Sequence, residues 1–304
     1  MFRRAKIGHA AKYPYVCRAA GYSLQPNTAP MFRYLINSFK RKMARRYFRE
    51  YPAKIYTFNI PGAGEIRFAN WENPLAAPKA ITQNEINFFK KFISPGDFVI
   101  DIGANIGHRT VAMALANGPS GLTLAFDPNP HVFKILQQNA GINGQRTNIV
   151  PLPYAITDED GEFFYNSSEA SFNNGGISRE KTARHGRFSL EQKIMGINLE
   201  KYLAQHYPER MARLKLIKID TEGYDKEIIK SIYNLIESCK PIVITECFSK
   251  TTPEERFEHF TLLASKGYKL FHFDDFVEQT PVTPIHQKED MLKWKHFDFY
   301  AIQP

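Results

Sequence analysis

Four apolar segments of this sequence each end in an acidic side chain, and these acids are the residues best suited to chemistry. The segments are FVID, LAFD, LIKID and VITE, which end at Asp101, Asp127, Asp220 and Glu246. If the segments are parallel strands, their carboxyl ends meet at one edge of a sheet, where such sheets bind ligands. A carboxylate buried there is costly unless a partner compensates its charge. The pattern therefore predicts a ligand that is cationic or rich in hydroxyl groups.

A glycine-containing turn follows the first of these acids, in the segment VIDIGANIG. Gly103 and Gly107 let the backbone approach a ligand at the start of a helix, although tight packing of helix on strand is the alternative explanation. Asp127 lies 24 positions after Gly103, where an acid can accept hydrogen bonds from two ribose hydroxyls. The spacing matches neither the G-x-G-x-x-G motif nor the P-loop. We therefore expect an adenosine-containing ligand without pyrophosphate.

The segment LIKIDTEGYDKEIIK places Lys218, Asp220 and Glu222 at alternate positions. Alternate residues of a strand share one side, so these three side chains should lie together while the strand persists. Gly223 then breaks the run, and a helix is expected from about Tyr224. A structural ion pair between Lys218 and one acid is the alternative interpretation, but it leaves the other acid without a partner.

The elements that position these acids alternate between strand and helix from residue 98 onward. Apolar strands that alternate with helices predict a mostly parallel sheet covered on both faces. Helices are expected from about Gly107 and Pro130, through Ile228 and Ile232, and over residues 254–265. The expected strands are FVIDI, LTLAF, NIVPLPYAI, LKLIKID, PIVITEC, YKLFHF and HFDFYAI, with a polar, irregular insertion between the last two.

Two smaller elements are expected before residue 98. The segment KIYTFNIPGAGEIRFAN is typical of a hairpin of two strands that turns at residues 61–64. Thr82 and Glu85 have the spacing of a capping box, which predicts the start of a short helix.

The first fifty residues differ in charge from the rest of the chain. They hold 12 Lys and Arg against one acid, whereas the remainder holds 28 Lys and Arg against 30 Asp and Glu. Residues 1–30 show no clear period and should be irregular. Residues 31–50 should form a basic amphipathic helix. Either its apolar stripe packs on the main domain, or the helix attaches to an anionic membrane surface, a glycolipid or another acidic substrate. An organelle transit segment is a further alternative.

Composition excludes several classes of protein. The chain has 304 residues, of which 43% are hydrophobic, so it can bury a large core. No apolar run is long enough to span a bilayer, and no secretory signal is present. Three widely spaced cysteines make neither a disulfide framework nor a thiolate metal site. We expect a cytoplasmic protein. The basic helix suggests the alternative of a cytoplasmic protein that associates with the inner face of the membrane.

The segments VIDIGANIG, AFDPNP, LIKIDTEGYDKEII and PIVITEC, in this order and spacing, resemble the FkbM family of S-adenosylmethionine-dependent methyltransferases. The resemblance covers about residues 80–272. It implies a Rossmann-like, mostly parallel seven-stranded sheet with helices on both faces and an antiparallel last strand. It also implies O-methylation of sugars, polysaccharides, glycolipids or polyketide-type hydroxyls. We expect a basic arm over 1–50, a hairpin or cap region over 51–80 and the methyltransferase domain over 81–304.

The resemblance and the acid pattern agree on the cofactor. Its sulfonium and its ammonium group are positively charged, and it has no phosphate, which fits the absence of a dinucleotide motif. Asp101 is expected at the methionine end, the glycine turn beneath the cofactor, Asp127 at the ribose and Ala155, Ile156 and Asp158 near the adenine. The expected cofactor residues are Asp101, Gly103, Ala104, Asn105, Gly107, Asp127, Pro128, Ala155, Ile156 and Asp158.

Methyl transfer to oxygen needs a base near the acceptor. The expected catalytic residues are Glu222 at the acceptor, and Asp220, which organises Lys218 and the cofactor; His185 is the alternative base. Residues 166–187 are long and polar, and are expected as an exposed loop or as a lid over the acceptor. No metal is expected, because cofactor and acceptor account for the acids. The expected substrate-binding residues are Asn173, Asn174, Arg179, His185 and Glu246.

Three other functions compete with sugar methylation. The acceptor could be a small secondary metabolite. A nicotinamide-dependent oxidoreductase shares this type of sheet, but the glycine spacing opposes it. A nucleic-acid-binding protein could use the basic arm and its interleaved aromatic residues, but that function leaves the four strand-end acids unexplained.

Overall fold

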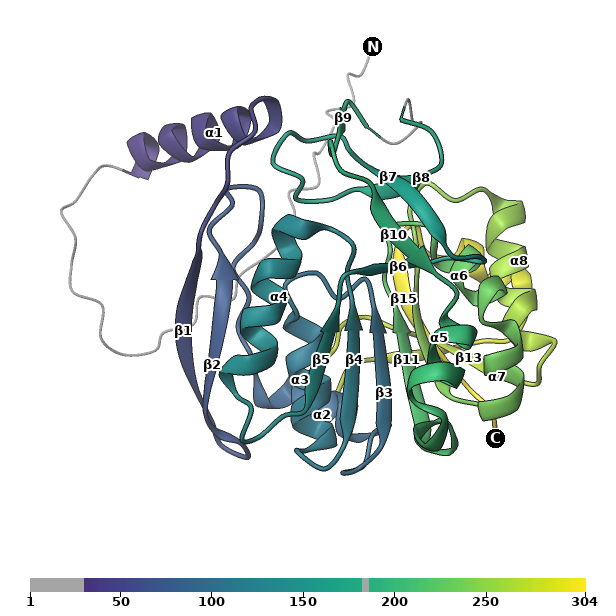
Figure 1. Cartoon of the computed structure of the whole chain (residues 1–304). Helices are drawn as coiled ribbons and strands as arrows, with labels where there is room; N and C mark the ends of the chain where they lie inside the picture. Colours follow the sequence, from purple (N-terminus) through teal and green to yellow (C-terminus); the bar gives the residue numbers. More distant parts are fainter. Residues whose placement is uncertain (1–29, 182–185) are drawn as a thin grey trace, which may run out of the picture.

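The computed structural model describes residues 30–181 and 186–304 of the chain. Most of the irregular leader expected over residues 1–30 lies outside the described residues, and so does His185. Figure 1 shows a large sheet flanked by helices, a smaller sheet above it, and a hairpin and one helix contributed by the first part of the described chain.

The main sheet has eight strands in the order β14-β13-β15-β12-β11-β3-β4-β5. The strands from β12 to β5 are parallel, and β15 runs antiparallel between β12 and β13, as expected for the last strand. The expectation of seven strands was wrong by one, because β14 forms within the insertion and pairs with the free edge of β13. The bounds are β3 Phe98–Ile102, β4 Leu122–Phe126, β5 Ile149–Leu152, β11 Leu214–Ile219, β12 Ile242–Cys247, β13 Lys269–Phe273, β14 Val282–Ile285 and β15 Phe297–Ile302.

The single strand expected over NIVPLPYAI is in fact two strands that belong to different sheets. Pro153 separates them, and a proline has no N–H with which to continue a ladder. The second piece, β6, pairs with β10 in a small sheet ordered β6-β10-β7-β8, and β9 also pairs with β7. This sheet takes up only residues 166–167 and 176–178 of the polar loop expected over residues 166–187. Its bounds are β6 Tyr154–Ile156, β7 Gly161–Ser167, β8 Gly176–Ser178, β9 Phe188–Ser189 and β10 Ile194–Ile197.

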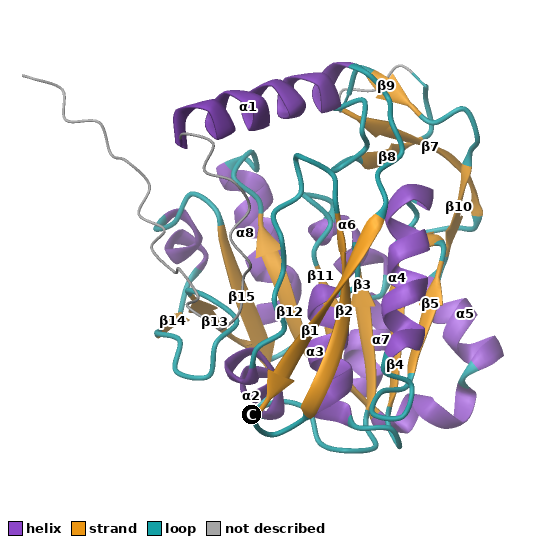
Figure 2. Ribbon diagram, turned by 90° about the vertical axis from the view of Figure 1, so that its left-hand side faces the viewer, coloured by secondary structure: helices purple, strands orange, loops and turns teal. Residues whose placement is uncertain are grey.

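Helices cover both faces of the main sheet, as Figures 1 and 2 show. One buried cluster joins alternate side chains of β3 to helices α5 to α8, and a second joins the opposite face to α2, α3 and α4. None of the described helices is long and apolar enough to cross a membrane. The helices are α1 Pro30–Arg46, α2 Gln83–Lys90, α3 His108–Asn117, α4 Pro130–Ile142, α5 Leu199–His206, α6 Asp225–Ser231, α7 Tyr233–Cys239 and α8 Pro253–Ala264, with 3-10 turns η1 Pro208–Arg213 and η2 Lys288–Leu292.

The expected hairpin is present as β1 Ala53–Ile60 and β2 Gly64–Trp71, paired antiparallel. Asn139 of α4 fastens it to the main domain. The Asn139 amide accepts a hydrogen bond from the Ala69 N–H at 2.7 Å and donates to the carbonyls of Ala69 and Ile106 at 3.0 and 2.7 Å. Because Ile106 belongs to the turn after β3, one buried side chain ties the hairpin to the glycine turn.

The helix expected at Thr82 begins there, but the capping is only partly as expected. The Thr82 hydroxyl accepts a hydrogen bond from the Glu85 N–H at 3.2 Å. The Glu85 side chain instead pairs with Arg109 of α3 and lies 3.4 Å from His108. This acid therefore links α2 to the start of α3, next to the glycine turn.

The amphipathic helix expected over residues 31–50 is observed as α1, which ends at Arg46 and so falls four residues short of the expected end. Its apolar stripe is not packed on the main domain, which was one of the two interpretations of the sequence. Phe32, Leu35 and Phe39 are each more than half exposed, whereas Ala44 is fully buried.

Candidate active site

A cavity of about 450 Å³ opens at the carboxyl edge of the main sheet. Its walls come from the turns after β3, β4 and β11, from the ends of β12 and β15, from β6 and from the segment that leads into β8. The volume lies within the range of small-molecule sites. Parallel strands thus bring their ends to one cavity, as the sequence predicted.

The glycines of the turn after β3 are required by contacts within the chain. Gly103 has a φ of +77°, and a Cβ atom there would lie 1.9 Å from the backbone oxygen of Asp220. Gly107 precedes α3 with a φ of +86°, and a Cβ atom there would lie 2.8 Å from Leu136 Cδ1. Gly103 lines the cavity, and Gly107 is outside the described lining. Close packing of the chain is therefore sufficient to explain both glycines.

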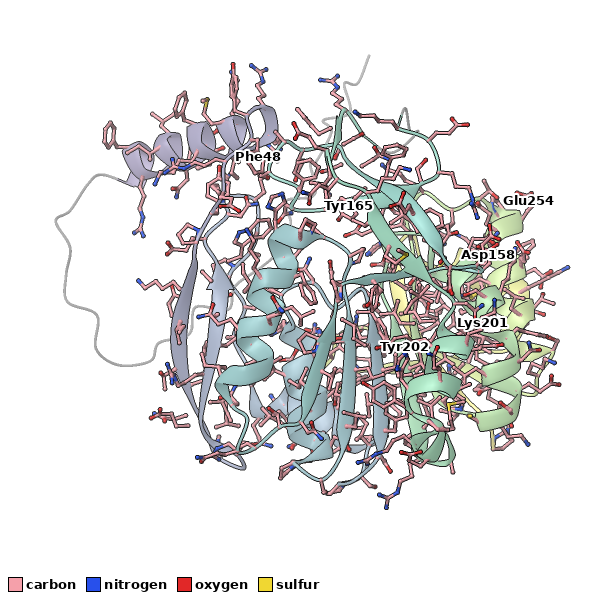
Figure 3. All side chains as sticks on the ribbon, viewed as in Figure 1. Phe48, Asp158, Tyr165, Lys201, Tyr202 and Glu254 are labelled. Atoms are coloured by element: carbon pink, nitrogen blue, oxygen red, sulfur yellow. The ribbon has the colours of Figure 1, made fainter. Side chains whose placement is uncertain are left out.

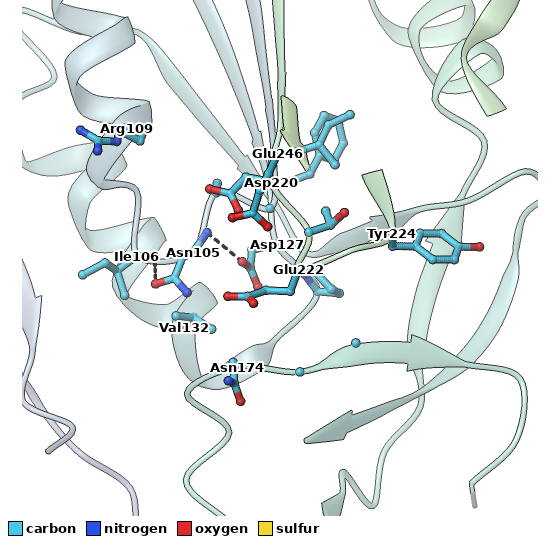
Figure 4. Close-up of a pocket in the computed structure, with 18 of the residues that line it drawn as sticks. Asn105, Ile106, Arg109, Asp127, Val132, Asn174, Asp220, Glu222, Tyr224 and Glu246 are labelled. Atoms are coloured by element: carbon cyan, nitrogen blue, oxygen red, sulfur yellow. Dashed lines mark hydrogen bonds between the residues drawn. The ribbon is translucent and has the colours of Figure 1, made fainter. Parts of the chain in front are cut away.

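Asp127 follows β4 and lies beside this turn. One carboxylate oxygen accepts a hydrogen bond from the Asn105 N–H at 2.8 Å (Figure 4), and the other accepts from the Asn129 N–H at 2.9 Å. Asn105 adopts a φ of 51°, and its own side chain accepts from the Ile106 N–H. Burial raises the pKa of Asp127 to about 6, although the two hydrogen bonds oppose the shift. Each oxygen keeps a lone pair for a hydroxyl of a ligand.

Lys218 and Asp101 form a buried ion pair beneath the cavity. The Lys218 ammonium lies 3.3 Å from Asp101 Oδ1 and 3.2 Å from Asp220 Oδ2. Burial alone would lower the pKa of Lys218, but the two carboxylates outweigh it and raise that pKa. Asp101 also accepts from the Thr110 hydroxyl at 2.6 Å and is fully buried. Asp101, expected at the cofactor, is therefore occupied by protein groups and does not appear in the described cavity lining.

The turn after β11 directs Glu222 into the cavity. β11 ends at Ile219, so the strand alternation expected for Glu222 does not persist that far. Glu222 instead has a φ of 56°, a left-handed conformation that is unfavourable for a glutamate. Glu222 lines the cavity. The partial burial of its carboxyl group, followed by the charge of Asp220, raises the pKa of Glu222.

Asp225 holds this turn in place from below. Its carboxylate accepts hydrogen bonds from the Thr221 hydroxyl at 2.9 Å and from the Thr221 and Gly223 N–H groups at 3.3 Å. It also accepts from the Glu246 N–H at the end of β12, at 3.3 Å. One buried acid therefore fixes two strand ends, and with them the backbones of two cavity acids.

Glu246 and Asp298 form the most crowded part of the acidic wall. They are directly opposed in the pairing of β12 with β15, and both line the cavity. Burial, followed by the neighbouring carboxylates Asp220 and Asp225, raises the pKa of Glu246 to about 9. Burial and then Asp220 raise the pKa of Asp298 to about 7. Glu246 Oε1 lies 3.0 Å from His296 Nε2, and its other oxygen has no hydrogen-bond partner among the described residues. Such acids favour a cationic ligand.

Most of the site residues expected from sequence lie around this cavity. Figure 4 shows the carboxylates of Asp127, Asp220, Glu222 and Glu246 gathered on one side, with Asn174 on the other. The expected residues that line the cavity are Gly103, Ala104, Asn105, Asp127, Pro128, Ala155, Ile156, Asn173, Asn174, Lys218, Asp220, Glu222 and Glu246.

Two further expected residues lie elsewhere in the described structure. Asp158 is exposed in the turn between β6 and β7 (Figure 3), where its backbone oxygen accepts from Asn198. Arg179 is exposed, pairs with Glu159 and lies over the ring of Phe163. Neither residue is among the described residues that line the cavity.

Sequence reasoning missed four residues that shape the site: Asp225, Asp298, Lys79 and Arg109. Lys79 and Arg109 line the cavity, and Arg109 lies 4.1 Å above the ring of Phe276. Asp225 is the last residue of the EGYD segment, so its position in this motif could have marked it as a residue of the site. Asp298 stood inside HFDFYAI, as an acid in an otherwise apolar strand. Over residues 30–181 and 186–304, no three His, Cys, Asp or Glu side chains are placed to hold a metal ion.

The strand order, the glycine turn after β3 and the acidic cavity at the carboxyl edge define a Rossmann-like methyltransferase fold. Residues 101–270 match the family model described as the methyltransferase FkbM domain. The chain therefore belongs to the FkbM methyltransferase family, as its sequence motifs predicted.

Two curated methyltransferases are related in sequence. The chain is 24% identical over 198 residues to the hexuronic acid methyltransferase AglP of Haloferax volcanii, over 64% of this chain and 75% of that protein. It is 23% identical over 198 residues to the methyltransferase sdnD of Sordaria araneosa, over 57% of this chain and 74% of that protein.

Solved structures show a more distant likeness. The FkbM methyltransferase of Methylobacillus flagellatus has a TM-score of 0.41 and 11% identity, covering 69% of this chain and 44% of that one. A SAM-dependent O-methyltransferase of Thermotoga maritima has a TM-score of 0.40 and 14% identity, covering 83% of this chain and 78% of that one. Similarity at this level does not inform the reaction.

Proposed function

We propose that this methyltransferase uses S-adenosyl-L-methionine to O-methylate a hydroxyl of a sugar, polysaccharide or glycolipid. The observation that carries the proposal is the acidic wall of the cavity, in which Asp220, Glu222, Glu246 and Asp298 face one space. Without a cationic ligand these carboxylates repel one another, and the pKa values of Glu246 and Asp298 are raised to about 9 and about 7. A sulfonium donor compensates that charge.

The residues present fit this cofactor. The cavity of about 450 Å³ suits a nucleoside-sized ligand. Asp127 would accept hydrogen bonds from the ribose hydroxyls, and the turn at Gly103 and Asn105 would support the methionine half. When bound, S-adenosyl-L-methionine supplies an electrophilic methyl group on a positively charged sulfur.

The protein's own part in the reaction is to orient the acceptor and to remove its proton. Glu222 takes the proton, because its carboxyl group reaches the cavity and its pKa is raised by burial and by Asp220. Lys218 holds Asp220 in place at 3.2 Å. Asn174, on the opposite wall in Figure 4, offers an amide to the hydroxyls of the acceptor.

The acceptor class is supported by a relative and by the cavity itself. The relative AglP is described as a hexuronic acid methyltransferase. Lys79 lines the same cavity as the acidic wall, and so does Arg109, which already pairs with Glu85, so the cavity offers Lys79 as a cation beside its carboxylates. We infer that a sugar with an acidic group fits better than a neutral one.

The test of the proposed function has two parts. S-adenosyl-L-methionine should raise the melting temperature of the protein, whereas NADH should not. Transfer of a labelled methyl group should then be found in a panel of neutral and acidic sugars, with the acidic ones preferred. Stabilisation by NADH alone would contradict the proposal and favour an oxidoreductase.

Cofactor affinity should fall when Asp127 loses its charge. We expect Asp127→Asn to weaken S-adenosyl-L-methionine binding by about 10- to 100-fold, because a charged acceptor of hydroxyl hydrogen bonds is lost. The pKa of Asp127 is raised to about 6, so the wild-type protein should bind more weakly as the pH falls below that value. Titration calorimetry from acidic to neutral pH measures both effects.

Asp158→Asn is the matched control for this prediction, because Asp158 is exposed in the turn after β6. It should leave the affinity unchanged. Equal losses in the two variants would point to a general effect of negative charge, and an unchanged affinity in Asp127→Asn would remove Asp127 from the ribose site.

A further inference from the structure

Helix α1 presents an apolar surface to solvent. We define the α1 surface as the large apolar side chains on α1 and just after it that are exposed by 39 to 65%. Its members are Phe32, Tyr34, Leu35, Ile36, Phe39, Met43 and Tyr47; Phe48 is left out because its ring packs against His131 and Phe172. Phe32, Leu35, Ile36, Phe39 and Met43 recur at helical spacing and share one side of the helix.

The helix is attached to the domain by its other side and by its end. Among residues 32–46, Ala44 is the residue that the described structure buries fully. The carbonyls of Ala44 and Arg45 each accept a backbone hydrogen bond at 3.1 Å from the segment after β7. Asn37, Lys40 and Arg41 line one groove against residues 72 and 74–78, and Phe39 and Met43 line a second groove with Glu72 and Pro74. Because its large apolar side chains stay exposed beside these open grooves, α1 is the reverse of a core helix.

The charged side chains of α1 itself are all positive. Arg33, Lys40, Arg41, Lys42, Arg45 and Arg46 lie on α1, which contains no acidic residue. Arg45 pairs with Glu169 at 3.5 Å. Lys42 and Arg46 are exposed and flank the apolar side. An apolar stripe bordered by cations matches the interface of an anionic bilayer, where rings and aliphatic chains enter the headgroup boundary and the cations meet lipid phosphates.

We propose that the α1 surface binds the protein to the surface of an anionic lipid bilayer. The helix lies in the plane of the interface with Phe32, Leu35, Ile36, Phe39 and Met43 inserted. Charge complementarity selects this partner, since a second copy of the chain would bring the same cations together. The inference concerns α1 alone and does not depend on the proposed reaction.

Helix α1 lies next to residues that also line the cavity. Leu75, Ala76 and Ala77 line both the groove beneath α1 and the acidic cavity. Figures 1 and 2 show α1 at the same end of the molecule as β7, β8 and β9. A bilayer bound at α1 therefore lies beside the cavity mouth, where an acceptor carried by a lipid would be delivered.

The experiment is co-sedimentation of the full chain with phosphatidylcholine vesicles that contain either no anionic lipid or about one third phosphatidylglycerol. We expect binding to the anionic vesicles that weakens at high salt. Leu35→Asp with Phe39→Asp, and separately Lys42→Glu with Arg46→Glu, should each lower the partition coefficient by about tenfold or more.

The matched controls change the same kinds of residue elsewhere. Val282 and Leu292 are exposed by 42 and 47%, so Val282→Asp with Leu292→Asp tests apolar loss away from α1. Lys54→Glu with Lys269→Glu tests charge, because both lysines are exposed. Both controls should keep wild-type partitioning, and all variants should keep the wild-type melting temperature.

Four results would overturn the proposal. The first is equal binding to the two kinds of vesicle, and the second is no binding to either. The third is a wild-type protein that does not bind vesicles, that is a dimer by analytical ultracentrifugation, and whose dimer dissociates in the Leu35→Asp variant. Tight RNA binding without vesicle binding would likewise assign the cations to another partner.

Discussion

Replacement of Lys218 by methionine is expected to lower the free energy of unfolding by about 3–5 kcal/mol. Lys218 is 2% exposed, and Asp101, which lies 3.3 Å from its ammonium, is fully buried. Without the lysine, the buried Asp101 carboxylate keeps the Thr110 hydroxyl as its one side-chain donor among the residues that the structure describes. The loss of Lys218 should destabilise the charged form of Asp220 less, because the Asp220 side chain is 42% exposed and can be hydrated. Urea denaturation of wild type and variant measures the difference.

Two further variants separate this effect from a general loss of a lysine. Lys230 also lies beside two acids, Glu227 and Glu258, but it is 37% exposed. Lys230→Met should therefore cost no more than about 1 kcal/mol. Asp101→Asn combined with Lys218→Met should recover part of the loss, because neither buried charge of this pair then remains. A double variant less stable than Lys218→Met would show that the uncompensated charge is not the cause.

The central sheet could be predicted because its strands are fully buried and therefore read as short apolar runs between helices. β14 could not, since Val282–Ile285 contains a proline and three exposed positions. It exists as a strand because β13 offers a free edge. The division of NIVPLPYAI into β5 and β6 could have been found at Pro153, whose missing N–H interrupts a ladder.

The candidate site was predictable where it depends on strand ends and less so where it depends on turns. Asp127 and Asp220 follow parallel strands and Glu246 lies at the end of one, so the sheet alone brings the three acids together. Asp298 lies near the start of β15, and placing it at the same edge requires that the direction of this strand be known. Asp158 follows β6, which leads into the second sheet and away from the cavity.

Backbone conformation was the other feature that the pattern of residues did not reveal. The alternation of Lys218, Asp220 and Glu222 suggested one strand, but β11 ends before Asp220. Glu222 reaches the cavity through a left-handed backbone, with a φ of 56°, and Asp225 holds the turn that allows it. A strained residue that carries a cavity carboxylate is a candidate for function.

Glu222→Gln is expected to lower the turnover of methyl transfer by about 100- to 10,000-fold while leaving cofactor affinity within about threefold. The amide has nearly the shape of the acid but cannot accept the proton of a hydroxyl. The pKa of Glu222 is raised by burial and then by Asp220, so its basic form is lost as the pH falls through this raised value. The wild-type rate should therefore rise with pH through this pKa, and the rate of the variant should lose that limb. An unaltered rate would remove Glu222 from the mechanism.

Glu222→Gly distinguishes a catalytic role from a structural one. Glycine adopts a φ of 56° without strain, so this variant should be as stable as the wild type or more stable by about 1 kcal/mol. It should nevertheless be as inactive as Glu222→Gln, because the carboxylate is gone. Glu227→Gln is the matched control, since Glu227 pairs with Lys226 and Lys230 on α6, and it should keep full activity. An active Glu222→Gly variant would mean that the turn, and not the side chain, serves the reaction.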